Sequence, residues 1–314
     1  GNFTYMFNTT HYTNRQVNTE YSQYPGEINT LTSGKMEDKL YEKSMTHTYY
    51  QANLYGTFER TFARDHNFKA MVGFNWETKF LKDVAATGYN LLSETLNDLN
   101  LVGQGADGEK RMEVGGGQNE YALMGFFGRL NYDYKGKYLV EASGRYDGTS
   151  RFKRGQRWGF FPSFSLAWDI TNEPFFPKLT WIDQIKVRGG YGSVGNQNIG
   201  NYLYATMYYP KASNGEASFV TDGRRGTPSL TWEKQKQTNI GVDLSFFNRR
   251  LNVTADVFFT RNKDLLMSHS LPTSSGYTTT TENIGDLDNR GFELQIKATP
   301  VATKDFTWNV GLNI

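Results

Sequence analysis

The amino-acid sequence predicts an all-β protein, a transmembrane antiparallel up-and-down β-barrel to which this chain contributes about eleven strands. Three observations lead to this fold class. Hydrophobic and polar residues alternate in long segments, short and long connections alternate between those segments, and aromatic residues recur at a spacing that matches a membrane. Residues 1–314 are therefore expected to form a single partial barrel domain.

The composition agrees with a surface that meets lipid on one side and water on the other. The chain has 22 Phe, 20 Tyr and 6 Trp, so 15% of its residues are aromatic, while only 38% are hydrophobic. A water-soluble core would draw more on Leu, Ile and Val. A formal charge of +2 argues against a nucleic-acid-binding surface. The absence of cysteine excludes a disulfide scaffold, a Cys-ligated zinc site and a cysteine nucleophile.

The alternation has a period of two residues. Between Trp158 and Trp168 the even positions are apolar, whereas Ser163, Ser165 and Asp169 lie on the other face. Similar patterns predict eleven strands, and no segment has a convincing helical period. The expected strands are 3–7, 50–58, 68–76, 122–134, 138–146, 158–168, 185–191, 238–246, 251–259, 292–298 and 306–314. Phe258 is the one aromatic residue in the 251–259 segment that falls on its polar face.

The connections between these strands alternate strictly in length. Short or medium links are expected at 63–67, 135–137, 171–182, 248–250 and 300–305. Longer polar links are expected at 13–45, 83–117, 148–157, 195–230 and 266–287. All short links then fall at one end of the sheet and all longer ones at the other, which is the layout of outer-membrane barrels.

Aromatic spacing gives a second estimate of the membrane thickness. Trp158 and Trp168 lie ten residues apart on one face, which corresponds to ~25 Å along the membrane normal at a strand tilt of ~40°. The other residues predicted to form membrane girdles are Tyr132, Tyr134, Tyr138, Tyr146 and Trp308. A soluble β-sandwich would also alternate, but its strands are usually ~5–6 residues long.

Sequence motifs for catalysis or cofactor binding are weak. Residues 190–195 fit G-x-G-x-x-G, but the turn-like segment 196–201 follows where a dinucleotide site needs a helix. Residues 286–291 resemble a calcium loop only faintly, because Arg290 and Lys297 occupy ligand positions. The four histidines are isolated and no G-x-S-x-G segment occurs. We therefore predict no enzyme, with no catalytic, cofactor-binding or metal-binding residue.

Charged residues on the polar face have a simpler interpretation than acid–base catalysis. The carboxylates are Glu141, Asp169, Asp243 and Asp256, and the basic residues are Arg145, Lys186 and Arg188. In a barrel these groups would line water and pair across strands.

The segment 196–229 is the candidate for contact with a ligand. Aromatic rings stack on the apolar faces of sugars, so this segment could contact a glycan through Tyr202, Tyr204, Tyr208 and Tyr209. The alternative is that these rings pack loop against loop over the barrel mouth.

Several segments, in order, resemble the C-terminal barrel region of SusC/RagA-type TonB-dependent transporters. They are 145–152 (RYDGTSRF), 159–168 (GFFPSFSLAW), 185–196 (IKVRGGYGSVGN) with Tyr202, 230–233 (LTWE), 239–243 (NIGVD), 246–251 (FFNRRL), 283–285 (NIG) and 289–293 (NRGFE). The resemblance covers about residues 118–314, whereas the earlier part fits only in its strand pattern.

The resemblance implies a 22-stranded barrel with a plugged lumen, of which this chain would be half, without the plug or the closing strands. It further implies import of glycans or peptides across the outer membrane of a Gram-negative, Bacteroidetes-type bacterium. The implied partners are TonB, which would act on the plug, and a SusD-like surface lipoprotein. The residues leave two alternatives open, a passive porin or structural outer-membrane barrel, and a soluble secreted all-β binding protein.

Overall fold

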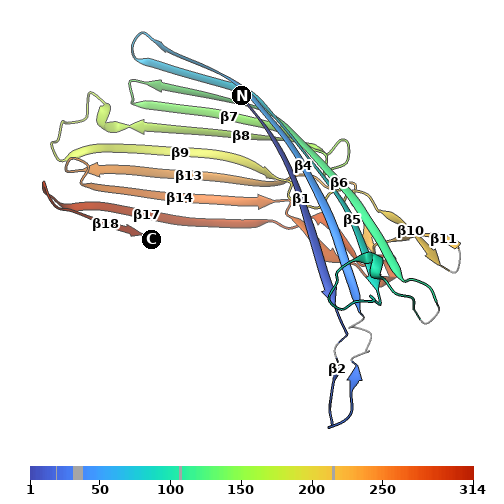
Figure 1. The fold of residues 1–314 in the computed structure, drawn as a ribbon. Helices are drawn as coiled ribbons and strands as arrows, with labels where there is room; N and C mark the ends of the chain where they lie inside the picture. Colours follow the sequence, from blue (N-terminus) through green and yellow to red (C-terminus); the bar gives the residue numbers. More distant parts are fainter. Residues whose placement is uncertain (19, 31–37, 106–107, 214–215) are drawn as a thin grey trace. The chain divides into compact units, whose positions relative to one another are not determined.

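The computed structural model describes residues 1–18, 20–30, 38–105, 108–213 and 216–314. The described chain is dominated by one antiparallel sheet of eleven strands (Figure 1). In sheet order the strands are β1 (Asn2–Gln16), β4 (Lys39–Phe62), β5 (His66–Tyr89), β6 (Met112–Tyr134), β7 (Tyr138–Thr149), β8 (Trp158–Asp169), β9 (Ile182–Asn196), β13 (Glu233–Phe246), β14 (Leu251–Lys263), β17 (Leu287–Ala302) and β18 (Thr307–Asn313). Ten of the eleven segments predicted from the alternation lie within one of these strands, and the eleventh, 306–314, extends one residue beyond each end of β18. The fold class is therefore confirmed.

Three strands are much longer than their apolar alternation suggested. β4 and β5 have 24 residues each and β6 has 23. The expectation that 13–45 and 83–117 are entirely loop was therefore wrong at both ends of each segment. Strand pairing satisfies backbone N–H and C=O groups whatever the side chains are. Strand pairing can thus continue into segments that are polar on both faces. Such segments show no alternation of hydrophobic and polar residues, so the sequence pattern does not reveal them.

The pattern of connections is confirmed. The short ones are 63–65, 135–137, 170–181, 247–250 and 303–306, and each of the first four is followed along the chain by a connection longer than itself, which after 170–181 is 197–232. The longer connections contain small elements of their own. These are β2 (Glu20–Tyr21) with β3 (Asn29–Thr30), the hairpin β10 (Tyr208–Ser213) with β11 (Glu216–Thr221), and a sheet of β12 (Arg224–Arg225), β16 (Thr279–Asn283) and β15 (Leu266–Ser270).

Three short 3₁₀ turns complete the described elements: η1 (Leu99–Leu101), η2 (Ile170–Asn172) and η3 (Thr273–Ser275). None of the helical turns in the described ranges has the length and hydrophobicity that a membrane-crossing helix needs.

The chain divides into two compact units. One comprises residues 3–51 and 77–121. Its small core contains Leu40, Leu91 and Val102, all buried. Close by, Arg15 pairs with Asp38 and donates to the carbonyl oxygen of Lys39 at 3.1 Å. These contacts join Arg15, near the end of β1, to residues 38 and 39 at the start of β4.

The other unit comprises residues 1–2, 52–76 and 122–314 and contains most of the sheet. Its strand register aligns the predicted apolar positions. One row across the sheet reads Val140, Leu166, Gly189, Ile240, Val257 and Phe292 from β7 to β17. The adjacent row reads Glu141, Ser165, Gly190, Asn239, Phe258 and Gly291. Because neighbouring residues of a strand point to opposite faces, the sheet has one apolar face and one polar face.

Candidate functional site

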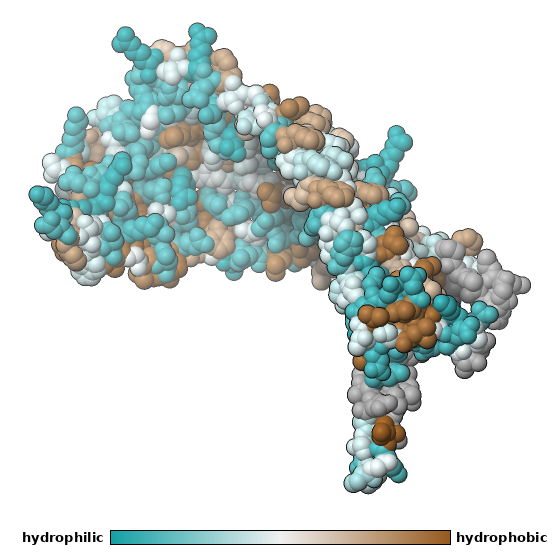
Figure 2. Space-filling view, viewed as in Figure 1, coloured by the Kyte–Doolittle hydropathy of each residue, from teal (hydrophilic) through white to brown (hydrophobic). Residues whose placement is uncertain are grey.

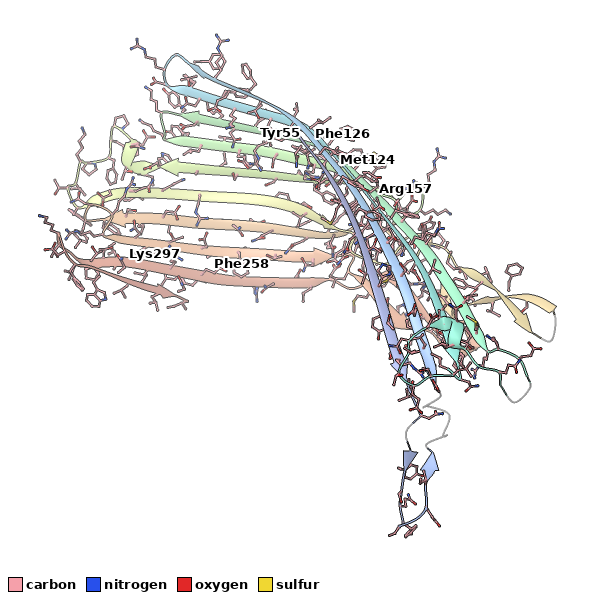
Figure 3. The ribbon with its side chains drawn as sticks, viewed as in Figure 1. Tyr55, Met124, Phe126, Arg157, Phe258 and Lys297 are labelled. Carbon is pink, nitrogen blue, oxygen red and sulfur yellow. The ribbon has the colours of Figure 1, made fainter. Side chains whose placement is uncertain are left out.

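The apolar face exposes large hydrophobic side chains over many strands. Phe160 on β8 is 62% exposed, Ile240 on β13 is 59% exposed and Phe292 on β17 is 57% exposed. Met124 and Phe126 project from the same face of β6 (Figure 3). An apolar surface of this extent is far larger than water-soluble monomers expose. It therefore fits the hydrocarbon of a bilayer.

Aromatic rings form a row beside the short connections, as predicted for a girdle. Tyr134 and Tyr138 stack with ring centroids 6.3 Å apart, and Tyr138 and Trp168 stack with centroids 6.4 Å apart. Tyr132 is partly exposed, and its hydroxyl lies 2.8 Å from Nδ1 of His66. Rings of this kind, apolar in body and polar at the tip, suit the boundary between hydrocarbon and headgroups.

Two further predicted girdle residues lie at the opposite end of β7 and β8. The rings of Tyr146 and Trp158 stack with centroids 4.8 Å apart and an interplanar angle of 14°. Trp308 lies on β18 next to the short connection 303–306 and is exposed. Tyr146 and Trp158 are thus separated from Tyr138 and Trp168 by most of the length of their strands. The assignment of all seven residues to membrane girdles remains a prediction.

A carboxylate outside the apolar band holds the first aromatic row. Glu173, in the connection between β8 and β9, accepts hydrogen bonds from Nε1 of Trp168 at 3.1 Å and from Nζ of Lys137 at 3.2 Å. The pKa of Glu173 is lowered, and the largest cause is a hydrogen bond from Tyr138. Desolvation raises this pKa, whereas the hydrogen bonds from Trp168 and Lys137 lower it further. The ionised carboxylate therefore ties three side chains of β7, β8 and the 135–137 turn together.

The polar face carries an ion-pair network centred on Arg188. Its Nε lies 3.1 Å from Asp243 and its Nη2 lies 2.6 Å from Asp256. The three residues come from three adjacent strands, β9, β13 and β14. This part of the predicted cross-strand pairing is confirmed.

The other predicted pairs were wrong in their partners. Arg145 bonds Asp147 on its own strand, at 2.8 Å. Glu141 accepts instead from Asn131 at 2.6 Å, with Arg129 at 3.7 Å, both on β6. Asp169 accepts from Gln184 at 2.8 Å and from Thr171 rather than from Lys186, its register partner. Register fixes which backbones face each other, whereas rotamers and competing donors decide which side chains bond.

A depression of about 610 Å³ is lined largely by side chains of the polar face. The charged and amide groups in its lining are Glu59, Arg60, Asn67, Lys69, Asn131, Asp133, Glu141, Lys186, Arg188 and Asn239. Hydrophilic side chains are widespread on the view of the molecule in Figure 2. Such a lining can hold water and offer hydrogen-bond donors and acceptors to a polar solute.

Aromatic residues on the polar face lie over glycines of neighbouring strands. Phe258, labelled in Figure 3, covers Gly291 so closely that a Cβ at position 291 would overlap its ring. Phe127 covers Gly73 in the same manner. The glycines therefore allow these rings to lie low on the sheet. This accounts for Phe258, the exception in the sequence pattern.

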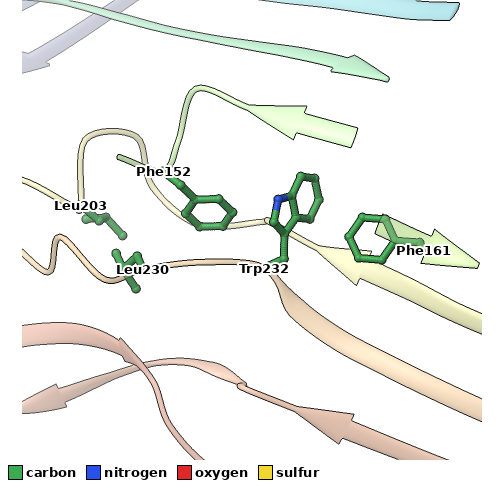
Figure 4. Close-up of a cluster of buried hydrophobic side chains, with 5 residues drawn as sticks. All are labelled: Phe152, Phe161, Leu203, Leu230 and Trp232. Atoms are coloured by element: carbon green, nitrogen blue, oxygen red, sulfur yellow. The ribbon is translucent and has the colours of Figure 1, made fainter. Parts of the chain in front are cut away.

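The loop ends are held by a small hydrophobic cluster (Figure 4). It consists of Phe152, Phe161, Leu203, Leu230 and Trp232. Trp232 is 4% exposed, and its Nε1 donates to the carbonyl oxygen of Arg157 at 2.8 Å. Sequence reasoning did not predict this cluster, because its members come from separate loops and from a strand position expected to be polar.

Polar contacts extend the loop assembly around this cluster. Asn283 of β16 accepts from the backbone N–H of Thr231 at 2.9 Å and donates to the carbonyl oxygens of Thr231 and Asp264, both at 2.9 Å. The hydroxyl groups of Thr227 and Thr280 form a hydrogen bond of 2.9 Å, and both residues are buried. These bonds connect the 197–232 loop to the small sheet of the 264–286 loop.

Two of the four tyrosines predicted to contact a ligand precede β10 in the chain, and the other two lie on β10. Tyr202 is 36% exposed and has a left-handed backbone, with φ of 61°. Tyr204 is half-buried beside the cluster residue Leu203. Tyr208 and Tyr209 lie exposed on β10, where a hydrogen bond with Tyr277 raises the pKa of Tyr208. Whether these residues touch ligand stays a prediction.

The motifs set aside in the sequence have structural explanations. Residues 190–195 lie inside strand β9. Asp286 and Asp288 both pair with Arg261, at 3.1 and 3.4 Å. In the described ranges, no group of three or more His, Cys, Asp and Glu residues is arranged to hold a metal.

An antiparallel sheet with an apolar face, a polar face, aromatic rows and connections of alternating length defines the wall of a membrane β-barrel. The whole chain, residues 1–314, matches the family described as "TonB dependent receptor-like, beta-barrel". The chain belongs to this family and is of its SusC/RagA type. Proteins of this type reside in the outer membrane of Gram-negative, Bacteroidetes-type bacteria, and this chain crosses that membrane many times.

Similar proteins agree with this assignment. TonB-dependent receptor P39 of Formosa agariphila is 32% identical over 295 residues, which cover 92% of this chain and 27% of that protein. TonB-dependent receptor SusC of Bacteroides thetaiotaomicron is 38% identical over 200 residues, which cover 61% of this chain and 20% of that protein. A solved structure of the RagAB peptide transporter superposes with a TM-score of 0.81 at 23% identity, over 99% of this chain and 33% of the solved one.

The chain thus spans about a quarter of the curated relatives it matches. The relatives are receptors and transporters rather than enzymes.

Proposed function

We propose that the whole protein imports nutrients through the outer membrane and that residues 1–314 are a single partial domain of its barrel wall. In this proposal the apolar face meets lipid and the polar face lines the lumen. The observation that carries it is the strand register, which places Ile240 in an apolar row across six strands and Asn239 in a polar row beside it. A wall with these two faces is what a water-filled pathway through a bilayer requires.

The cargo that we propose is a glycan or a peptide, and the energy source is TonB. Two names support this: one relative is called TonB-dependent receptor SusC, and a similar structure is called a peptide transporter. The rest of the protein would then supply a plug, the segment that binds TonB and the remaining strands of the barrel. This chain would act as a static wall without catalysis or a cofactor, and a SusD-like surface lipoprotein would be the outer partner.

Transport assays distinguish this function from a passive porin or a structural barrel. A strain lacking the gene would be complemented with the full-length protein and given labelled oligosaccharides or labelled peptides. Active import predicts that uptake of one class returns, and that removal of TonB or addition of a protonophore abolishes it. Uptake that persists without TonB would indicate a porin. Restoration of neither class would remove the transport proposal.

The role of the loop tyrosines is tested in the same strain. If Tyr202 and Tyr204 contact cargo through their rings, Tyr202→Ala with Tyr204→Ala should weaken uptake several-fold at unchanged barrel yield. The matched variant, Tyr202→Phe with Tyr204→Phe, keeps both rings and should keep most of the uptake. The pair Tyr208 and Tyr209 is tested likewise. Equal uptake by the Ala and Phe variants would show that these rings do not bind cargo.

The partner is tested by affinity purification of the tagged full-length protein from outer membranes in mild detergent. A surface lipoprotein recovered in equal amount with the barrel supports the partnership. Recovery of the barrel alone, under conditions where its uptake activity persists after reconstitution, would argue against it.

A further inference from the structure

The apolar face of the sheet contains a groove of about 710 Å³. It spans strands β7, β8, β9 and β13, and its lining includes Val140, Leu166, Val187, Gly189, Tyr191 and Ile240. These residues lie in the membrane-spanning part of the wall. The groove and the polar depression share several lining residues, among them Leu166 and Gly189, because they lie on the two sides of the same strands. The groove is the one on the apolar side, where Val187, Tyr191 and Ile240 belong to its lining alone.

The groove exists because one position in the apolar row has no side chain. Gly189 stands between Leu166 of β8 and Ile240 of β13, which are 49% and 59% exposed. Two residues away along β9, Val187 and Tyr191 form the ends of the gap. The gap is therefore bordered by the side chains of Leu166, Ile240, Val187 and Tyr191, and the backbone of Gly189 lies at its base.

Packing does not require a glycine at this position. A Cβ built on Gly189 would meet only the carbonyl oxygen of Asn239, at 3.7 Å, which is an ordinary contact. Gly189 is also not among the residues with positive φ. By contrast, a Cβ on Gly241 of the polar face would lie 2.9 Å from the guanidinium carbon of Arg188. Gly241 makes room for an ion pair, whereas Gly189 leaves space open toward the membrane.

The groove lies in one leaflet. Its lining extends along β8 from Trp168, beside the short connections, to Phe164. Four residues correspond to ~10 Å along the membrane normal at a tilt of ~40°, which is less than half of an apolar band ~25 Å tall. Short connections of outer-membrane barrels face the periplasm, so the groove opens to the periplasmic leaflet.

We propose that this groove is a binding site for one acyl chain of a phospholipid of the periplasmic leaflet. The chain segment lies in the gap over Gly189 and contacts Leu166, Ile240 and Val187. The rings of Tyr138 and Trp168 mark the level where the hydrocarbon ends and the glycerol and headgroup begin. The hydrophobic residues of the lining fit a hydrocarbon chain, whereas Arg188 and Asn239, which the lining also includes, belong to the rows of the polar face. Filling the gap adds dispersion contacts that a flat strand surface does not provide.

The test measures phospholipid that remains bound to the full-length protein after extraction from outer membranes in mild detergent. Native mass spectrometry counts the lipids per barrel, and lipid extraction identifies them. The variant Gly189→Leu fills the groove from within. We expect the retained phospholipid at this site to fall at least fivefold relative to the unchanged protein.

Gly56→Leu is the matched control. Gly56 lies on the apolar face of β4 between Leu54 and Phe58, and nothing lies within 4 Å of its Cβ position. It therefore adds the same bulk to the same face without filling a groove, and it should retain phospholipid like the unchanged protein. Thermal unfolding of both variants confirms that each barrel is folded.

Equal retention by Gly189→Leu and Gly56→Leu would overturn the proposal. The proposal would also be overturned if Gly189→Leu lost bound lipid A and kept its phospholipid, because lipid A belongs to the other leaflet. If Gly189→Leu does not fold, the milder Gly189→Ala takes its place, and brominated phospholipid is added to quench the fluorescence of tryptophans that it contacts. The quenching is measured with Trp168 present and with Trp168→Phe. If removing Trp168 leaves the quenching unchanged, the lipid does not lie beside Trp168 and the proposed site is contradicted.

Discussion

The indole Nε1 of Trp168 donates a hydrogen bond to Oε1 of Glu173 at 3.1 Å. Trp168 is the last aromatic residue of β8, and Glu173 stands in the connection that follows. Since Glu173 also accepts from Lys137 and Tyr138, one carboxylate holds three side chains at the membrane boundary. The girdle is thus an assembly of bonded groups rather than a set of independent rings.

Replacing this carboxylate should loosen the girdle. We expect Glu173→Ala to lower the thermal unfolding temperature of the full-length barrel in detergent and to broaden the Trp emission, because Trp168 loses its acceptor. Asn172→Ala is the control in the same connection, since the Asn172 side chain bonds only the carbonyl oxygen of Gly136 in the described structure. If both variants unfold alike, Glu173 has no special role.

The same carboxylate predicts a dependence of stability on pH. Because the pKa of Glu173 is lowered in the folded protein, its contribution is fully present above the ordinary pKa of glutamate. It is lost as the pH falls through the lowered folded-state value. The gap in unfolding temperature between the unchanged protein and Glu173→Gln should therefore be widest near pH 7 and shrink below about pH 4. A gap that stays constant down to pH 3 would contradict this.

Arg188 should be the most sensitive charged residue of the polar face. Arg188→Met leaves Asp243 and Asp256 facing each other without their cation, which should cost about 1–2 kcal/mol after allowance for their partial exposure. Arg145→Met removes an ion pair within one strand and should cost at most about 0.5 kcal/mol. Chemical unfolding of both variants gives the comparison. Restoring neutrality with Asp243→Asn and Asp256→Asn should recover part of the loss.

The loop cluster should unfold separately from the sheet. Trp232→Ala removes a buried ring that touches Phe152 and Phe161, and it should destabilise the loop assembly by about 3–5 kcal/mol. Hydrogen exchange should accelerate in residues 197–232 while the central ladder between β13 and β14 stays protected. Phe160→Ala, at an exposed position of β8, should leave exchange in that loop unchanged. Uniform acceleration over the whole chain would show that loop and sheet unfold together.

The sequence by itself determined the strands, their two faces and the alternation of their connections. Each of these is a local property: a strand such as 158–168 shows its period within eleven residues, and the turn at 135–137 lies between two such strands. The resemblance of segments such as 185–196 to the SusC/RagA family was equally local, and it was confirmed by the family match together with the similarity to SusC.

Only the tertiary structure decided what depends on residues far apart in the chain. The extra length of β4, β5 and β6 came from ladder pairing, which polar side chains neither reveal nor prevent. The choice of Asp256 as a partner of Arg188 depended on how three strands align, and the burial of Trp232 depended on loops meeting over β8. The groove at Gly189 is of the same kind, because a glycine in one strand becomes a hollow only when the register places Leu166 and Ile240 on either side of it.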